Sequence, residues 1–529
     1  MSRPEAQPAP APRRSGYEVV VGLEVHLALR TRSKLFCGCP AGDDVAVLHD
    51  GGAVLHDGGA VVRNGGADPP LPNRHVCPVC LGLPGALPVT NARAVELAVR
   101  FAAALGCAVP DVTAFARKHY GYPDAPKNYQ ISQHDRPVGL GGALELPNGR
   151  RIGLVRCHLE EDAGRLIHPT YADHSLVDLD RAGAPLIELV TAPDLRSGDD
   201  ARAFLEEVRA LARALDVSDA TPEEGRMRAD VNVSLRRPGE PLGTKVEVKN
   251  LNSFKSVQAA IESEARRQER LLQAGRAVSQ ETRGWNEGGQ KSYVLRTKEE
   301  AADYRYLDDP DLPPIRLTRD WLAAVHAATP ETPAALRRRY EAAGLRRDDA
   351  ERLATDVDLA RAFDALVAAA DTTTSPSGAT AGTPPAPQTL ANWLLVEVVG
   401  WAKAAGTDVT ALGLHEPGPA RNLAALVALI DAREITGPTA KALLPEVLAG
   451  GDPVALVAEG GLRQVSGADE LAGWVDAALA AHPDVAAGAR EQPKAVNFLM
   501  GKVMQASRGQ ARPDAVRALL LERLGIGDA

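Results

Sequence analysis

YEVVVGLEVHLALR, residues 17–30, alternates strictly between two kinds of position. Every odd position is apolar, whereas the even positions include Glu18, Glu24, His26 and Arg30. Side chains two residues apart share one face of a β-strand, so this period predicts a half-buried strand with Glu24 and His26 on one face. A carboxylate beside an imidazole can bind a metal or exchange a proton, although a solvated sheet face would carry the same pattern.

The length and composition of the chain limit its class. A chain of 529 residues is too long for one hydrophobic core, so we expect two to four domains. With 45% hydrophobic and 24% charged residues it resembles soluble globular proteins, and no apolar run approaches the ~20 residues that span a membrane. Residues 1–16 lack the apolar segment of a secretory signal, which predicts a disordered tail on a cytoplasmic protein. Because the net charge is −9, a nucleic-acid partner would need a local basic patch.

Four of the six cysteines form two closely spaced pairs, Cys37 with Cys39 and Cys77 with Cys80. In a cytosolic chain such pairs indicate tetrahedral zinc, because each turn supplies two thiolates. Four reduced cysteines in loops remain the alternative. Between the pairs lies a duplication rich in Gly and Asp, residues 48–62, within a predicted flexible insert at 41–72.

Basic and aromatic side chains gather in two segments that prolines and glycines interrupt. The first, residues 118–133, contains Lys118, Tyr120 and Lys127, and the second, residues 280–315, contains Arg296. This combination suits stacking and phosphate contacts. A loop held to the core by its tyrosines explains the first segment equally well.

Acidic residues gather in two further segments with strand character. Glu160, Glu161 and Asp162 end one of them, and Glu188 lies within the apolar context of the other. Carboxylates flanked by Val, Leu and Ile are costly to bury without a cation, so they indicate Mg²⁺, which prefers oxygen ligands. Strand ends exposed to water are the alternative.

RMRADVNVSLRR, residues 226–237, and TKVEVKN, residues 244–250, alternate in the same way as the first strand. They predict a β-hairpin with one apolar face and one charged face, and the charged face includes Asp230, Glu247 and Lys249. If this face continues the one that carries Glu24 and His26, the two form a charged pocket for ATP and Mg²⁺. An exposed sheet face would look the same in sequence.

Helical periodicity appears at residues 90–106, 198–216 and 252–275, and it dominates after residue 318. We therefore expect a strand-rich domain over 17–316 and a helical domain over 317–407. A mobile linker over 371–387 should interrupt that helical domain.

A helical tail should complete the chain over 408–529. Residues 491–529 carry six basic and four acidic side chains, a local charge of +2, which favours a nucleic-acid-binding tail. A solvated helix pair is the alternative. The candidate basic residues are Lys494, Lys502, Arg508 and Arg512.

Several ordered blocks together resemble a known family. The blocks are VVGLEVHLAL, HVCPVCLGLPGALPVTN, KHYGYPDAPKNYQIS, LEEDAGR, SLVDLDRAGAPLIELV, VKNLNSFKSV and QETRGWNE with DYRYLDDPD. They resemble the B subunits of the aspartyl/glutamyl-tRNA(Asn/Gln) amidotransferases, and NFLMGKVMQASRGQARP is similar to the tail domain of that family. The resemblance extends from about residue 17 to the C-terminus and is interrupted at the insert and the linker.

The resemblance implies an α+β fold, with an antiparallel-sheet, glutamine synthetase-like catalytic domain followed by an all-α domain and a helical tail that binds tRNA. It implies that ATP phosphorylates the side-chain carboxylate of Glu-tRNA(Gln), Asp-tRNA(Asn) or both. Ammonia would then amidate the acyl phosphate. The A subunit of such an enzyme, an amidase, would supply the ammonia from glutamine, and a small C subunit would brace the pair.

The resemblance also implies roles for individual residues. The Mg²⁺ and phosphorylation site would comprise Glu24, His26, Glu161 and Glu188, with Asp230 and Glu247 as further candidates. Contacts to phosphate or carboxylate would come from Lys118, Tyr120, Lys127, Lys249 and Arg296. The four paired cysteines match a zinc site that some members of the family carry.

Two other functions compete with this one. A non-catalytic, zinc-containing tRNA-binding scaffold would have an acidic face that is merely solvated. A synthetase-like ligase would adenylate an amino acid, but the sequence lacks the HIGH-like and KMSKS-like signatures of class I synthetases. It also lacks a Gly-rich Walker loop, so an ATP site here would not be of the P-loop type.

Overall fold

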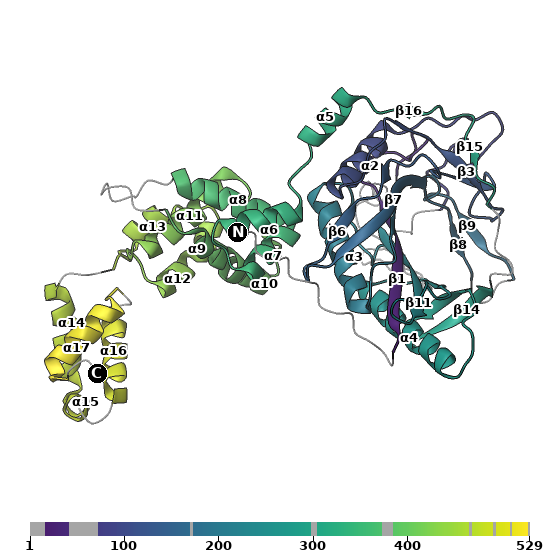
Figure 1. The fold of residues 1–529 in the computed structure, drawn as a ribbon. Helices are drawn as coiled ribbons and strands as arrows, with labels where there is room; N and C mark the ends of the chain where they lie inside the picture. The colour runs from purple at the N-terminus through teal and green to yellow at the C-terminus, as the bar shows by residue number, and fades with distance from the viewer. Residues whose placement is uncertain are drawn as a thin grey trace, which may run out of the picture. The chain divides into compact units, whose positions relative to one another are not determined.

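The chain folds into two compact units, residues 1–332 and 333–529 (Figure 1). The computed structural model describes residues 16–41, 72–169, 173–297, 304–372, 384–464, 468–489, 493–507 and 510–526. Most of the expected tail at 1–16, the insert at 41–72 and the linker at 371–387 therefore lie outside the described residues.

A nine-stranded sheet organises the first unit, with the order β14-β13-β12-β11-β1-β10-β7-β5 and β6 paired to β7. Its strands are β1 (Glu18–Ala28), β5 (Gly139–Leu140), β6 (Ala143–Glu145), β7 (Arg151–Glu161), β10 (Pro185–Thr191), β11 (Met227–Arg236), β12 (Val246–Lys249), β13 (Glu281–Asn286) and β14 (Lys291–Thr297). The strand expected at 17–30 is thus confirmed as β1, and it lies near the middle of the sheet.

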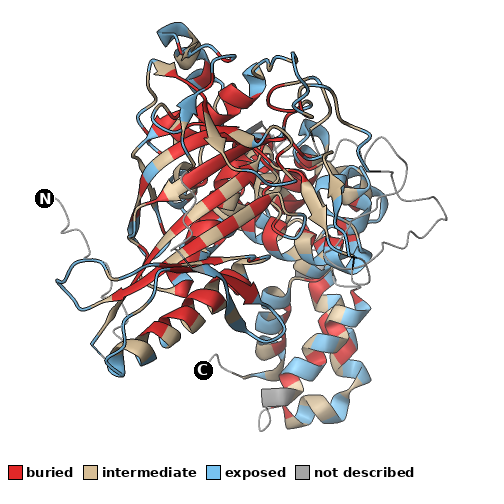
Figure 2. Ribbon diagram, turned by 90° about the vertical axis from the view of Figure 1, so that its right-hand side faces the viewer, coloured by how far each residue is buried: buried red, intermediate tan, exposed pale blue. Residues whose placement is uncertain are grey.

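The alternation along β1 separates a core face from a polar face. Leu23, Val25 and Leu27 are at most 1% exposed, whereas Glu24 and His26 between them are only partly buried. Figure 2 shows the same banding of buried and intermediate residues along the central strands. The hydrophobic effect therefore holds one face of the sheet against the core and leaves the other for polar groups.

Almost all neighbouring strands of this sheet are antiparallel, including the expected hairpin of β11 and β12. The exception is the pair β12 and β13, which is parallel. Helix α4 (Phe254–Gln273) connects these two strands, and a helical crossover returns the chain to the same end of the sheet. The sheet that the resemblance implies to be antiparallel therefore contains one parallel pair of strands.

The three expected helices cover the apolar face of the sheet, and each begins at a side chain that accepts backbone N–H groups. They are α2 (Ala92–Ala104), capped by Asn91, α3 (Gly198–Ala214), capped by Ser197, and α4, capped by Ser253. Each cap satisfies donors that the first helical turn leaves without partners. Leu97, Phe204 and Ile261 extend from these helices into the same core as β1.

Three small sheets complete the strands of the first unit. They are β2 (Val112–Thr113) with β16 (Ile315–Arg316), β8 (Arg165–Ile167) with β9 (Leu176–Asp178), and β15 (Leu307–Asp308) with β3 (Ala116–His119) and β4 (Tyr129–Ser132). Helix α5 (Arg319–Ala327) also belongs to this unit, because Val325 is 4% exposed and lies in its core. The first unit therefore ends later than the boundary expected at 316/317.

Every described element of the second unit is helical, as the periodicity after residue 318 predicts. Its elements are α6 (Pro333–Ala342), α7 (Arg347–Thr355), α8 (Val357–Thr372), α9 (Pro387–Asn392), the π-helical η2 (Trp393–Val398), α10 (Val399–Ala405), the 3₁₀ helix η3 (Val409–Leu412), α11 (Pro417–Asp431), α12 (Gly437–Leu448), α13 (Pro453–Glu459), α14 (Ala468–Ala481), α15 (Pro483–Gly488), α16 (Pro493–Ala506) and α17 (Pro513–Leu524). Among the described residues, no helix combines the length and apolarity that crossing a bilayer requires.

The hydrophobic cores of the second unit do not divide at the boundary expected at 407/408. One hydrophobic cluster extends from Leu336 to Val457, and a separate one extends from Leu471 to Leu520. Helices α8 and α11 pack together within the first cluster, so residues on both sides of 407/408 share one core. The change of core comes instead between Val457 and Leu471.

We expect Leu23→Ala to lower the free energy of unfolding by about 2–5 kcal/mol, because it removes a buried side chain and leaves a cavity beneath the central strand. Urea unfolding followed by circular dichroism measures this change. Leu242→Ala is the matched control, since Leu242 is 56% exposed and its truncation should change the free energy by no more than about 0.5 kcal/mol. Equal effects of the two variants would contradict the placement of β1 in the core.

Candidate functional site

The polar face of the sheet brings together side chains from strands that are far apart in sequence. The pairing of β1 with β11 sets His26 opposite Arg228, and the pairing with β10 sets it opposite Glu188. The pairing of β10 with β7 then sets Glu188 opposite His158. Arg228, His26, Glu188 and His158 therefore form one row across four strands.

Three side chains on this face could hold a metal ion. His26, Glu160 and Glu188 each offer a ligand atom, and these atoms lie within 4.8 Å of one another. The Nε2 atom of His26 is 3.4 Å from a carboxylate oxygen of Glu160 and 3.4 Å from one of Glu188. We call these three residues the first acidic cluster. Nitrogen and carboxylate oxygen ligands at this spacing are compatible with a divalent cation.

The first acidic cluster holds ionisable groups at unusual pKa values. Burial alone would lower the pKa of His26, but hydrogen bonding to Glu188 and the charge of Glu160 raise it from 6.5 to about 9. Burial and the charge of Glu188 raise the pKa of Glu160. Burial would also raise the pKa of Glu188, but the imidazoles of His158 and His26 hold it well below its usual range. The cluster therefore keeps one carboxylate ionised and crowds a second against it.

A second group of carboxylates lies beside the first. Glu24, Asp230 and Glu247 come from β1, β11 and β12, and their oxygens also lie within 4.8 Å of one another. We call them the second acidic cluster. The ammonium group of Lys249 contacts Asp230 and lies 3.2 Å from Glu247, and Asn232 donates a hydrogen bond to Glu24.

One lysine does not neutralise the three carboxylates of the second acidic cluster. Burial, followed by the charges of Glu188, Asp230 and Glu247, raises the pKa of Glu24. In contrast, burial at Glu247 is outweighed by Lys249 and the hydrogen bond from Thr282, which lower the pKa of that carboxyl group. Like charges at this spacing repel, so a bound cation would relieve the cluster.

Two other predicted contact residues, Lys118 and Arg296, lie in different surroundings. Lys118 lies over the ring of Tyr304, with its ammonium nitrogen 4.9 Å from the ring centre. Burial would lower the pKa of Lys118, but the charges of Glu160 and Glu188 raise it, which places this cation near the first acidic cluster. Arg296 is exposed on β14 and donates a 3.4 Å hydrogen bond to Thr282, whose hydroxyl donates to Glu247.

Glu161 does not join the first acidic cluster, which corrects the predicted ligand set. Its carboxylate oxygens lie 2.5 and 2.6 Å from the ammonium nitrogen of Lys127, and one oxygen accepts the backbone N–H of Ile131. The reason is the strand period, because Glu160 and Glu161 are adjacent in β7 and point to opposite faces. Glu160 takes the place beside His26 that the resemblance implied for Glu161.

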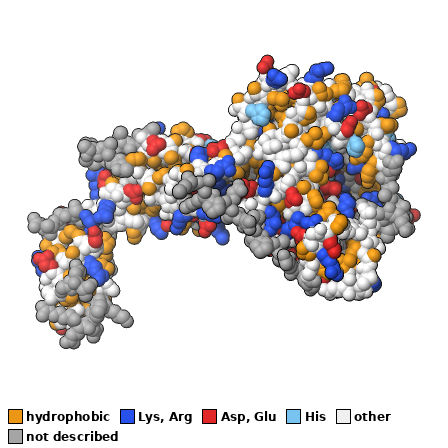
Figure 3. Space-filling view, in the orientation of Figure 1, with side chains coloured by type: hydrophobic (Ala, Val, Ile, Leu, Met, Phe, Trp, Pro, Cys, Tyr) orange, Lys and Arg blue, Asp and Glu red, His pale blue; other side chains and the backbone are white. Residues whose placement is uncertain are grey.

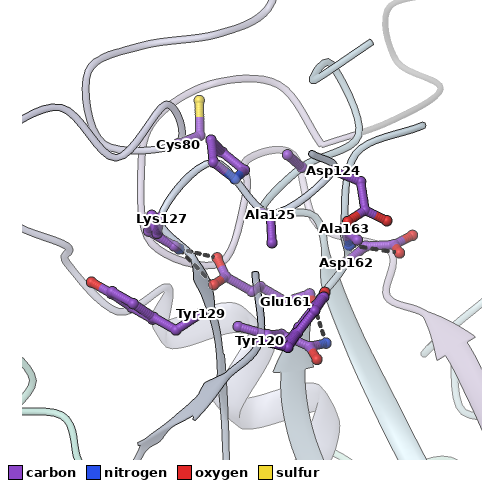
Figure 4. Close-up of a pocket in the computed structure, with 13 residues that line it drawn as sticks. Cys80, Tyr120, Asp124, Ala125, Lys127, Tyr129, Glu161, Asp162 and Ala163 are labelled. Atoms are coloured by element: carbon purple, nitrogen blue, oxygen red, sulfur yellow. Dashed lines mark hydrogen bonds and ion pairs between the residues drawn. The ribbon is translucent and has the colours of Figure 1, made fainter. Parts of the chain in front are cut away.

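Lys127 and Tyr120 lie with Glu161 instead of with the acidic clusters. Together with Cys80 and Asp124 they line a cavity of about 10 Å³, which has room for about one water molecule (Figure 4). Burial raises the pKa of the Tyr120 hydroxyl. The resemblance implied a phosphate or carboxylate contact for Lys127, and in the structure its ammonium group forms a buried ion pair with Glu161.

Sequence reasoning did not assign His158 and Arg228 to the site, and it named Glu160 only within the acidic triplet that indicates Mg²⁺. In CHLEE the apolar residues Cys157 and Leu159 alternate with His158 and Glu160, and this period marks the latter two as partners on the polar face. The same signal marks Arg228, two residues before Asp230 on β11. The alternation was thus available, but the resemblance favoured the neighbouring Glu161.

The four paired cysteines converge although a long insert separates the pairs. The sulfur atoms of Cys37, Cys39, Cys77 and Cys80 lie within 4.8 Å of one another. The backbone N–H of Cys77 donates to the sulfur of Cys80 at 3.0 Å. Four sulfurs at this spacing fit the tetrahedral ligand set of zinc.

A buried lysine lies beside the cysteine cluster, and its backbone N–H donates to the carbonyl oxygen of Cys39. Lys34 is fully buried, and its ammonium group donates hydrogen bonds to the carbonyl oxygens of His75 and Leu179. A hydrogen bond from the Cys37 thiol, with further help from the charge of Lys34, lowers the pKa of Cys80 to about 4 despite burial. The cluster therefore already favours a thiolate, the form of cysteine that binds metal.

The basic residues expected in the tail lie only in part within the described residues. Arg508 and the side chain of Lys494 lie outside them. Lys502 lies over the ring of Phe498 at 5.5 Å on α16, and Arg512 precedes α17 and forms an ion pair with Asp514. In the first unit, acidic and basic side chains are interspersed over the face that Figure 3 shows.

Comparison with known proteins covers both units. Residues 19–323 match the family model described as the GatB/GatE catalytic domain, and residues 379–524 match the one described as the GatB domain. The chain is 51% identical over 512 residues to the B subunit of the aspartyl/glutamyl-tRNA(Asn/Gln) amidotransferase from Thermus thermophilus, with 97% of this chain and all of the relative covered. The protein of the same name from Deinococcus radiodurans is 49% identical, with 96% and 100% covered. The one from Anaeromyxobacter dehalogenans is 44% identical, with 97% and 99% covered.

The raised pKa of His26 predicts a pH-dependent stability. Its protonated form stabilises the metal-free fold fully below pH 6.5, and this contribution disappears as the pH rises through about 9. The difference in free energy of unfolding between wild type and His26→Gln should therefore fall by up to about 3 kcal/mol over this window. Urea unfolding at a series of pH values with a chelator present measures it, and a difference independent of pH would contradict the protonation of His26.

Proposed function

Because the chain belongs to the family of the aspartyl/glutamyl-tRNA(Asn/Gln) amidotransferase B subunits, we propose that it supplies the site at which a misacylated tRNA is amidated. Its substrates are Glu-tRNA(Gln), Asp-tRNA(Asn) or both, together with ATP and ammonia. The observation that carries this proposal is the convergence of two acidic clusters on one polar face of the sheet. A merely solvated face would not need to hold two sets of three ligand groups this close together.

The reaction has two chemical steps. An oxygen of the side-chain carboxylate attacks the γ-phosphorus of ATP, and the bond from that phosphorus to the β,γ-bridging oxygen breaks, so that ADP leaves with the electron pair. Ammonia then attacks the carbonyl carbon of the acyl phosphate. The carbon–oxygen bond to phosphate breaks, phosphate leaves with its electron pair, and the nitrogen loses a proton to give the amide.

The acidic clusters fit Mg²⁺ by their chemistry. His26, Glu160 and Glu188 would hold one ion, because they bring two carboxylates and an imidazole together. Glu24, Asp230 and Glu247 could hold another, because three carboxylates there face one lysine. Bound Mg²⁺ would neutralise phosphate charge and help to orient the γ-phosphoryl group. We therefore replace Glu161 by Glu160 in the ligand set.

The cations around the clusters have a separate task. Lys118 lies near the first acidic cluster, and Lys249 contacts the second. Both side chains can attract the phosphates of ATP and the carboxylate of the aminoacyl group toward an otherwise acidic face. Arg296, at the exposed edge strand, can extend this attraction outward.

Ammonia must come from elsewhere in this proposal. The chain supplies no glutaminase residues that the family motifs identify, so the amidase of the assembly, its A subunit, hydrolyses glutamine, while the small C subunit braces the pair. An enclosed path between the subunits would keep ammonia unprotonated and away from water. The helical second unit, with Lys502 and Arg512 among its basic residues, would bind the tRNA.

We also propose a relation between the central sheet and that of glutamine synthetase. Both reactions activate a side-chain carboxylate as an acyl phosphate for attack by ammonia. A largely antiparallel sheet with an acidic polar face supports this relation.

The cysteine cluster has a structural task in this proposal. Cys37, Cys39, Cys77 and Cys80 would bind zinc and join two chain segments that flank the insert. The ion would keep Cys80 beside the cavity that Lys127 and Glu161 line.

Glu188→Gln tests the catalytic role. In the reconstituted complex of the three subunits, with free ammonia as donor, we expect the rate of Glu-tRNA amidation to fall at least ~100-fold, because the ligand set loses a negative charge. Hydrolysis of glutamine by the amidase partner should continue. Glu206→Gln is the control, since Glu206 is half-exposed on α3 and pairs with Arg202. Wild-type amidation by Glu188→Gln would favour the scaffold function instead.

Cys80→Ser tests the zinc proposal. The wild-type protein should contain about one zinc ion per chain, and the variant should lose most of it, because a hydroxyl group is a poor substitute for a thiolate ligand. Mass spectrometry of the metal content of each purified protein measures the number of zinc ions per chain. Cys107→Ser changes a buried cysteine outside the cluster and should keep the metal. Stoichiometric zinc in Cys80→Ser would exclude the assignment.

A further inference from the structure

Arg228 lies where the two acidic clusters meet. It is directly opposite His26 of the first cluster in the pairing of β1 with β11. Two residues further along β11, on the same face, is Asp230 of the second cluster. Side chains so placed are roughly 7 Å apart along a strand, within reach of one small ligand.

Two contacts hold the Arg228 guanidinium at this position. Its Nη2 donates to a carboxylate oxygen of Asp162 at 2.5 Å, and its Nε donates to the carbonyl of Gly225 at 3.3 Å. Asp162 is buried, and its side chain is 7% exposed. A charge-assisted contact to a buried carboxylate fixes the orientation of the planar guanidinium group.

The local charge leaves Arg228 able to bind an anion. Asp162 also contacts Arg181, whose Nε lies 3.2 Å from the same carboxylate oxygen, so one negative charge faces two guanidinium groups. The Nη1 of Arg228 has no hydrogen bond or ion pair to the described residues, and 40% of the side chain is exposed. Besides Asp162, the charges of Glu160 and Asp230 also act on Arg228 and help to raise its pKa, but its Nη1 donors stay open to solvent beside the acidic face.

The substrates of the proposed reaction need such a charge. Both groups that must meet on this face, the γ-phosphoryl group of ATP and the side-chain carboxylate, present negatively charged oxygens. The six ligand groups of the clusters include five carboxylates, which repel these oxygens. A fixed guanidinium offers two parallel N–H donors to an oxyanion, and its charge is permanent at physiological pH.

We propose that Arg228 binds the reacting oxyanion of the substrate, either the γ-phosphoryl group or the side-chain carboxylate. This assignment rests on the proposed function of the polar face. Asp162 is then a positioning residue, since it orients Arg228 without touching the substrate. Lys118, near the first acidic cluster, approaches the same face from β3, so that positive charges flank the reacting group.

Arg228→Ala in the complex of the three subunits is the first test. We expect the rate of ammonia-dependent amidation to fall ~100-fold or more, as when one donor to a transition-state oxyanion is removed. Added guanidinium ion should restore part of the rate, because the position is open to solvent. Arg236→Ala is the matched control, because Arg236 lies on the same face of β11 and pairs with Glu18. This variant should amidate at the wild-type rate, and added guanidinium should not change that rate.

Two further measurements identify the oxyanion. If Arg228 contacts the γ-phosphoryl group, the variant should bind ATP more weakly in equilibrium dialysis and lose tRNA-dependent ATP hydrolysis. If it contacts the carboxylate, ATP binding should stay unchanged while the KM for Glu-tRNA rises. Either result supports the proposal.

Two results would overturn it. One is amidation by Arg228→Ala at the wild-type rate. The other is a loss of activity that guanidinium does not restore and that accompanies a lowered melting temperature, which indicates a structural ion pair with Asp162 alone. Glu188→Gln in the same assays separates this failure from that of the proposed function: an inactive Glu188→Gln beside a fully active Arg228→Ala would refute only the role of Arg228.

Discussion

The antiparallel pairing of β1 with β10 and β11 is the constraint on which the candidate site depends. It sets residues 24–28 opposite residues 186–190 on one side, and residues 24–27 opposite residues 227–230 on the other. Because side chains alternate along a strand, a slip of one residue would exchange Glu24 and His26 with Leu23 and Val25. The apolar face of β1, where Leu23, Val25 and Leu27 are at most 1% exposed, prevents such a slip. The core therefore determines the geometry of the polar face.

The separation of an apolar face from a polar face explains how the fold tolerates five carboxylates close together. Ionised Glu24 and Glu160 cost free energy through burial and through repulsion by their neighbours, as their raised pKa values indicate. His26, His158 and Lys249 offset part of that cost. The hydrophobic core beneath the sheet and the capped helices that cover it stabilise the fold against the rest of this free-energy cost.

The elements of the first unit could be predicted because their signals are local. A period of two predicted β1 and the hairpin of β11 and β12, and a helical period of apolar residues predicted α2, α3 and α4. The ends of the units could not be predicted in the same way. Helix α5 joins the first core through Val325, and α8 packs with α11 across residue 407. The sequence near these helices contains no pattern that predicts either contact.

The sequence by itself determined which face each polar residue of a strand would occupy, since the alternation with buried neighbours decides it. It placed Glu24 and His26 together, and it marked the hairpin acids Asp230 and Glu247. Only the tertiary structure decided which faces share a site, and that Glu160 with His158, and not Glu161, lies beside Glu188. The physical reason is register: pairing between strands that are far apart along the chain, with an irregularity at Val190/Thr191, cannot be read from either strand alone.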